Sequence, residues 1–140
     1  MVQVVQEGER IRLEYRTIAA DNALAPLLVF LHEGLGSLSA WREFPDRLCA
    51  AGGLRGLVYS RAGYGLSTPR PHPRRWRPDF MHVQAREVLP ALFDALGVDS
   101  RTSPPWLFGH SDGASIALIY AATFPDRVAG TIAVAPHLFV

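Results

Sequence analysis

The chain has 140 residues, of which 49% are hydrophobic and 19% charged, and its formal net charge is +1. This length fits one domain with a modest core, and the composition is typical of a soluble globular protein, which excludes a disordered chain. The balanced charge gives no reason to expect a nucleic-acid partner.

The first elements expected along the chain are an opening hairpin and two buried strands. Residues 2–5 and the alternating residues 10–18 predict the hairpin, which is joined through a turn at 7–9. Two short and almost continuously apolar runs follow, at 26–32 and 54–60. Strands with this pattern are buried on both faces, as in a parallel sheet.

Three segments carry apolar side chains at helical spacing, namely residues 38–51, 79–96 and 112–124. In the second, Asp79 is the expected N-cap, Gly97 is the expected C-cap, and Pro90 predicts a kink. Residues 67–80 are rich in Pro and Arg and include Trp76, so we expect a solvated surface loop there. The alternative is that these arginines and Trp76 bind an anion or a base.

Two more apolar runs, at 105–111 and 128–135, are expected to be buried strands. After the hairpin, strands and helices therefore alternate along the chain. Such alternation predicts an α/β fold, in which a mostly parallel sheet has helices on both faces. We expect residues 1–140 to belong to a single domain, because we see no internal repeat and no second domain.

The remaining composition predicts a cytoplasmic protein without a metal or a cofactor. Cys49 is the only cysteine, so an intramolecular disulfide and a thiolate zinc cluster are excluded, and its apolar helical surroundings predict a buried, inert thiol. The polar N-terminus is not a signal peptide, and no apolar run reaches the roughly 20 residues of a transmembrane helix. We expect a small-molecule substrate and neither a nucleic-acid nor a membrane partner, and the oligomeric state stays open.

Unusual residues follow three of the predicted strands, at the sheet edge where parallel α/β folds bind ligands. "FLHEGLGS" at 30–37 places two glycines where backbone N–H groups could stabilise an oxyanion. "YSRAGYGLS" at 59–67 lacks the ending of a phosphate-binding loop, so we interpret it as support for the site. "FGHSDGAS" at 108–115 is a Gly-x-Ser-x-Gly pattern between a strand and a helix.

The third motif predicts a nucleophilic serine at position 111. Ser111 would sit on a sharp, strained turn, and Gly109 and Gly113 would lie against backbone that leaves no room for side chains. The N–H of Asp112, at the start of the following helix, would donate to an oxyanion. The alternative is an ordinary strand-to-helix turn with Ser111 as the N-cap.

Together the motifs resemble those of the α/β-hydrolase fold family, in its serine-nucleophile branch. "HEGLGS" resembles the family's His-Gly oxyanion loop, "SRAGYGLS" its Asp-x-Arg-Gly-x-Gly-x-Ser segment, and "GHSDGA" its nucleophile elbow. The resemblance runs from about Arg10 to the C-terminus. It implies that Ser111 is the nucleophile, that Asp112 and Gly34 supply the oxyanion N–H groups, and that His32 is structural.

The resemblance also places the catalytic acid and histidine beyond the last predicted strand, where this chain has no matching positions. His137 follows that strand, and we expect it to line the mouth of the site or to be exposed rather than to act as the base. The chain would then hold the nucleophile and the oxyanion hole without the base. We expect it to be the N-terminal part of a longer hydrolase, lacking the C-terminal strands and the cap.

Two functions are carried forward from the sequence. The first is a serine hydrolase that acts on small esters or related carbonyl compounds through an acyl-enzyme, with C–C bond hydrolysis, perhydrolysis and acyl transfer left open. The second is a non-catalytic fragment of such a fold that binds a ligand or a partner protein through its exposed edge strand.

Overall fold

A computed structural model describes residues 1–70 and 77–137 of the chain. The chain opens with an antiparallel hairpin of β1 (Val2–Gln6) and β2 (Glu9–Leu13). Its turn uses Glu7 and Gly8, both with positive φ, at 49° and 80°. The predicted hairpin is therefore confirmed.

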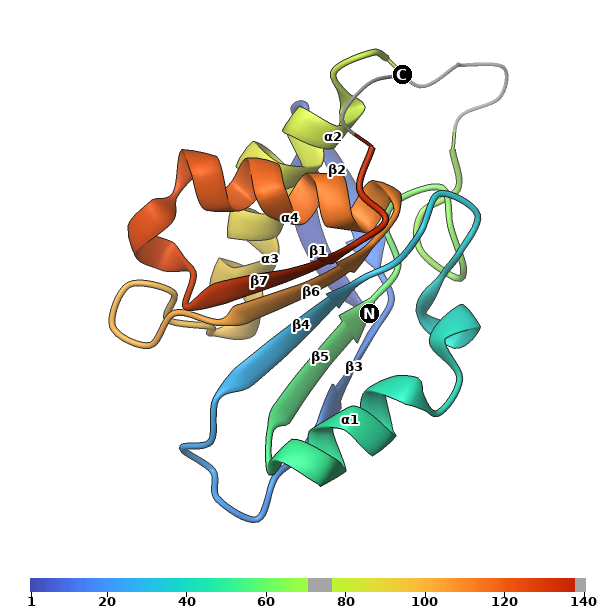
Figure 1. Ribbon diagram of the computed structural model, residues 1–140. Helices are drawn as coiled ribbons and strands as arrows, with labels where there is room; N and C mark the ends of the chain where they lie inside the picture. Colours follow the sequence, from blue (N-terminus) through green and yellow to red (C-terminus); the bar gives the residue numbers. More distant parts are fainter. Residues whose placement is uncertain (71–76, 138–140) are drawn as a thin grey trace.

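A five-stranded mixed sheet follows, with the order β3-β5-β4-β6-β7 (Figure 1). Its strands are β3 (Tyr15–Ile18), β4 (Leu27–Leu31), β5 (Arg55–Tyr59), β6 (Trp106–His110) and β7 (Gly130–Val134). β3 pairs with β5 in the antiparallel direction, and all other pairs are parallel. The predicted mostly parallel sheet is thus confirmed.

Helices cover both faces of the sheet, as predicted (Figure 1). Along the chain they are η1 (Leu38–Trp41), α1 (Phe44–Gly52), α2 (Phe80–Val83), the π-helical segment η2 (Gln84–Val88), α3 (Leu89–Leu96), α4 (Asp112–Thr123) and η3 (Pro125–Arg127). α1 lies on one face, and α3 and α4 lie on the other. No helix in the described residues is long and apolar enough to cross a lipid bilayer.

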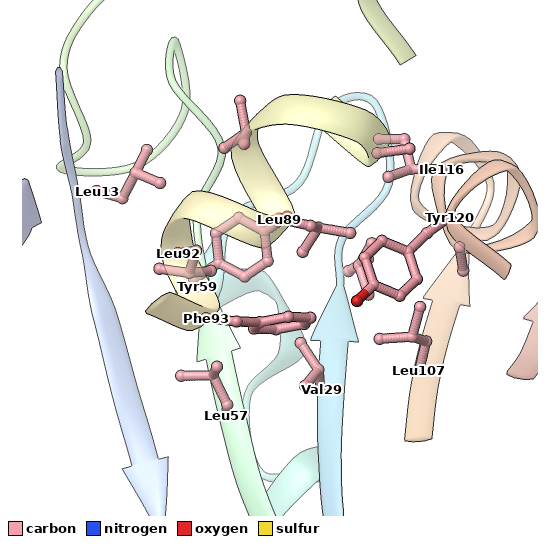
Figure 2. Close-up of a cluster of buried hydrophobic side chains, with 14 of the residues drawn as sticks. Leu13, Val29, Leu57, Tyr59, Leu89, Leu92, Phe93, Leu107, Ile116 and Tyr120 are labelled. Atoms are coloured by element: carbon pink, nitrogen blue, oxygen red, sulfur yellow. The ribbon is translucent and has the colours of Figure 1, made fainter. Parts of the chain in front are cut away.

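The two faces of the sheet build two separate hydrophobic clusters, because successive strand side chains point to opposite faces. In β4, Val29 and Leu31 join the larger cluster against α3 and α4, whereas Leu28 and Phe30 join the smaller one on the α1 side. Figure 2 shows the larger cluster, in which Phe93 of α3 meets strand side chains and Tyr120 of α4. Burial on both faces explains why these strands are almost continuously apolar.

Two predicted elements are divided in the structure. Residues 10–18 were expected to form one strand of the hairpin, but the pairing changes at Glu14, and β3 joins the main sheet instead. Residues 38–51 were expected to form one helix, but a 3-10 helix and α1 are separated at Arg42, whose φ is 50°. The apolar periodicity persists across both breaks, because both parts pack on the same cores.

The helical region before residue 97 also departs from a plain α-helix. Gly97 has the left-handed conformation expected of a C-cap, but the Asp79 side chain makes no cap hydrogen bond. The π-helical segment η2 ends just before Pro90. Proline lacks an N–H, so the regular α-helical hydrogen bonding is interrupted there. The irregularity takes the form of a widened, π-helical turn.

Cys49 is buried with 1% of its surface exposed, on the inner side of α1. Burial raises the pKa of its thiol, and the nearby Asp46 carboxylate adds to this effect. The prediction of a buried thiol is confirmed. Residues 71–76 of the predicted Pro/Arg loop, including Trp76, lie outside the described residues.

Candidate active site

The candidate nucleophile lies at the junction between β6 and α4. Ser111 has φ 54° and ψ −116°, a conformation that residues with a Cβ rarely adopt. Its N–H donates to the carbonyl oxygen of Val134 at 2.8 Å, which ties the turn to the end of β7. Ser111 makes no side-chain cap hydrogen bond to α4, so the simple N-cap alternative has no support.

The surrounding backbone leaves no room for a side chain at either of the two glycines around Ser111. A methyl group at Gly113 would overlap the carbonyl oxygens of Leu31 and His32 in and after β4. One at Gly109 would overlap the backbone of Gly113 and Ala114. The first turn of α4 is therefore packed directly against the neighbouring strands, and this close packing fixes the direction in which Ser111 points.

The loop after β4 lies beside the start of α4. Glu33 accepts a backbone hydrogen bond from Gly36 at 3.1 Å, which forms a tight turn around Gly34. A Cβ at Gly34 would lie 2.6 Å from Oδ2 of Asp112, so the two predicted oxyanion residues are in contact. The N–H of Asp112 is the first of its helix and has no acceptor within α4.

His32 and Arg61 form a buried network under this loop, and each is only 2% exposed. The Arg61 N–H donates to Nε2 of His32 at 3.0 Å, so the ring proton is on Nδ1, which donates to the Glu33 carbonyl at 2.6 Å. The Arg61 guanidinium donates to the carbonyl oxygens of His32 and Glu33. Burial, together with the charge of Arg61, lowers the pKa of His32 to about 3.

A second network fastens the loop at 60–67 to its neighbours. The Ser60 hydroxyl accepts from the N–H of Leu38 at 2.7 Å and donates to a Glu14 carboxylate oxygen. The Ser67 hydroxyl donates to the Ser60 carbonyl at 2.7 Å and accepts from the N–H of Glu14 at 2.9 Å. These bonds join the loop at 60–67 to Leu38, the first residue of η1, and to Glu14, which directly precedes β3.

The structure brings His137 into the site, where the sequence predicts it only at the mouth. Its Nε2 lies 2.8 Å from Oγ of Ser111 and 3.2 Å from Oδ1 of Asp112. The His137 side chain is still 45% exposed, so it does line the opening. Contact with Ser111 depends on the sharp turn at Ala135, whose φ is 51°, and the strand pattern gives no sign of that turn.

Two further histidines in the described residues make no bond to Ser111. His110 points its Nδ1 toward Glu33, with 3.8 Å between the nearest nitrogen and oxygen, and His82 lies exposed on α2. His72 lies outside the described residues. Within residues 1–70 and 77–137, no group of three metal-ligating side chains gathers.

Sequence reasoning did not single out Arg61 or Ser115. Arg61 directly follows a buried strand, and a charged residue at that place is a signal that could have been read. Ser115 is 4% exposed on α4, and its hydroxyl bonds both the N–H and the C=O of His137. A serine in a helix as apolar as α4 gives no such signal, because it fits the small-residue packing equally well.

Comparison with known proteins gives consistent matches over most of the chain. A family model described as the α/β hydrolase fold matches residues 26–139. Human monoglyceride lipase is 32% identical over 109 residues, which cover 78% of this chain and 34% of the lipase. Proline iminopeptidase of Lactobacillus helveticus is 28% identical over 131 residues, which cover 90% of this chain and 42% of the peptidase.

A solved structure has the same arrangement of elements. The thermophilic esterase of Thermogutta terrifontis superimposes with a TM-score of 0.73 at 24% identity, over 97% of this chain and 45% of the esterase. At this identity the likeness shows the fold. The chain spans about a third to two fifths of the length of the curated relatives it matches.

Proposed function

The chain belongs to the α/β hydrolase fold family, and we propose that it acts as a serine hydrolase on small esters, with Ser111 as the nucleophile. The observation that carries the proposal is the turn at Ser111. Its φ of 54° is a strained conformation in a residue that is not glycine, and such strain persists only where the surrounding structure enforces it. Here the enforcement comes from β4, whose carbonyl groups leave no room at Gly113.

In the proposed reaction, Ser111 attacks the scissile carbonyl and two backbone N–H groups stabilise the oxyanion that forms. Oγ of Ser111 attacks the carbonyl carbon, its proton passes to a base, and the carbonyl oxygen becomes an oxyanion. The N–H groups of Asp112 and Gly34 donate to that oxyanion, and the N-terminus of α4 favours its negative charge. The leaving alkoxide takes up a proton and departs, which leaves the acyl group on Ser111, and water then releases the acid.

Esters are the favoured substrate class because of the name of one relative. That relative is named monoglyceride lipase, and the name denotes ester hydrolysis in the relative. Another relative is named proline iminopeptidase, so an amide is the alternative carbonyl substrate to be compared in the same assay.

Turnover of short-chain p-nitrophenyl esters tests this proposal. We expect the wild-type chain to hydrolyse p-nitrophenyl acetate or butyrate at least about 10-fold faster than the Ser111→Ala chain, because the variant keeps the fold but lacks the attacking oxygen. Prolyl p-nitroanilide should be cleaved more slowly than the esters.

The matched control is Ser103→Ala, which removes an exposed loop hydroxyl remote from the site and should keep the wild-type rate. A folded wild-type chain that is no faster than Ser111→Ala on any ester or amide would contradict the proposal, and would favour the non-catalytic alternative.

A further inference from the structure

Arg61 lies under the loop after β4, and we propose that it is a positioning residue of the oxyanion site, which orients the Glu33–Gly34 peptide and strengthens the Gly34 N–H as a hydrogen-bond donor. This inference rests on the function proposed above and adds to it a residue that acts through the loop, not on the substrate. Arg61 is only 2% exposed, although its guanidinium is charged. A buried charge is costly unless polar groups surround it, so the partners of Arg61 indicate its role.

The guanidinium of Arg61 is bonded to the backbone, not to a carboxylate. It donates to the His32 carbonyl at 2.5 Å and to the Glu33 carbonyl at 3.1 Å. No ion pair among the described residues includes Arg61. The Cζ atom of Arg61 lies over the ring of Tyr64, 5.1 Å from the ring centroid. The charge of Arg61 is therefore directed at two successive peptide groups of one loop.

Three hydrogen bonds fix the plane of the peptide between Glu33 and Gly34. The Glu33 carbonyl accepts from the Arg61 guanidinium at 3.1 Å and from Nδ1 of His32 at 2.6 Å. The N–H of Gly36 donates a third bond to it at 3.1 Å. In a trans peptide the C=O and N–H bonds point in opposite directions, so the Gly34 N–H points away from Arg61. Among the described residues this N–H has no hydrogen-bond acceptor, and it is therefore available to an oxyanion.

The charge of Arg61 strengthens this donor. A cation that is hydrogen-bonded to a carbonyl polarises the whole peptide group, so the N–H at its other end becomes a stronger donor. Arg61 also offsets the carboxylate of Asp112, whose Oδ2 lies 2.6 Å from the position of a Cβ at Gly34. Burial lowers the pKa of Arg61 and the charge of Asp112 counteracts this effect, so the two groups are coupled. Without Arg61, Asp112 would place an uncompensated negative charge beside the oxyanion.

The NMR resonances of the Glu33–Gly34 peptide test whether Arg61 orients it. Glutamate is followed by glycine at 7–8 and at 33–34 in the sequence. A chain labelled with ¹³C at the glutamate carbonyl and with ¹⁵N at glycine therefore gives one signal for each of these peptides. We expect Arg61→Met to move the Glu33 ¹³C and Gly34 ¹⁵N resonances upfield, because this carbonyl loses a charged donor. The Gly8 signal, from the turn of the hairpin, should stay in place.

The rate at which a fluorophosphonate labels Ser111 tests the effect of Arg61 on the oxyanion site. In this reaction Oγ of Ser111 displaces fluoride from phosphorus, and the phosphoryl oxygen takes the place of the oxyanion. We expect Arg61→Met to lower the maximal labelling rate at least about 10-fold and to leave the probe concentration for half-maximal rate unchanged, because a transition-state donor is weakened. Arg61→Lys keeps the charge but not the planar fork of donors, so it should recover part of the rate.

Arg55→Met is the matched control and should leave the rate and both signals unchanged. Arg55 is half-buried at the start of β5 and donates to the Ala25 carbonyl at 2.7 Å, so this variant also loses an arginine–backbone bond, but not one in the oxyanion loop.

A folded Arg61→Met chain that is labelled at the wild-type rate, or whose Glu33–Gly34 resonances do not move, would overturn the role of Arg61. If Arg61→Met does not fold, Arg61→Lys takes its place, and the wild-type rate in that chain would overturn the same role. A folded wild-type chain that is never labelled would instead overturn the proposed function, whatever the resonances show of the peptide.

Discussion

Gly113→Ala is expected to destabilise the folded chain by about 3 kcal/mol or more, because the added methyl group would occupy the position of backbone atoms. The atoms in conflict are the carbonyl oxygens of Leu31 and His32, which belong to a central strand and the loop after it. A flexible side chain could move aside, but these carbonyls cannot move without displacing β4. Denaturant unfolding of the two chains, followed by circular dichroism, measures the difference.

Gly97→Ala is the control for this substitution. Gly97 ends α3 with φ 70°, and a methyl group there would meet no heavy atom within 4 Å. Its cost is therefore conformational alone, about 1 kcal/mol. Equal losses from the two substitutions would contradict the claim that contact between α4 and β4 forces glycine at position 113.

Acidification from pH 7 to pH 4 is expected to cost about 3 kcal/mol of stability through His32 alone. Burial and the charge of Arg61 hold the pKa of His32 in the folded chain at about 3, whereas an unfolded histidine titrates near pH 6.5. Between these values the unfolded chain binds a proton that the folded chain does not. The stability due to His32 is thus complete above about pH 6.5 and is lost progressively as the pH falls toward 3.

The free energy of unfolding at pH 4, 5, 6 and 7 measures this loss. His32→Gln removes the titrating ring, so its stability should change by about 3 kcal/mol less than that of the wild type over the same range. His82→Gln removes an exposed histidine and should follow the wild-type pH dependence. Parallel curves for the wild type and His32→Gln would show that His32 is not kept neutral by burial.

The strands and helices that build the site could be predicted because their patterns have a direct physical cause. Apolar runs such as 26–32 mark strands covered on both faces, and Gly109 and Gly113 mark a turn with no space for side chains. The divisions at Glu14 and Arg42 could not be predicted in the same way. Each depends on where the chain leaves one packing partner for another, while the local apolar pattern continues unchanged.

The candidate site could be predicted only as far as local contacts reach. Ser111, Asp112 and the glycines around them are near one another in sequence, so their spacing alone suggests a nucleophile. The contact between His137 and Ser111 instead requires a turn at Ala135 and a hydroxyl from Ser115, which lies 22 residues away in the chain. No periodicity encodes such a contact.

Mapping the fluorophosphonate adduct by mass spectrometry tests most directly whether Ser111 is an activated nucleophile. We expect one phosphonyl group on Ser111 in the folded wild-type chain and none in Ser111→Ala, because only a serine with an oxyanion site and a nearby base reacts readily. An adduct found on a different serine, such as Ser115, or a folded chain that stays unlabelled, would contradict that claim.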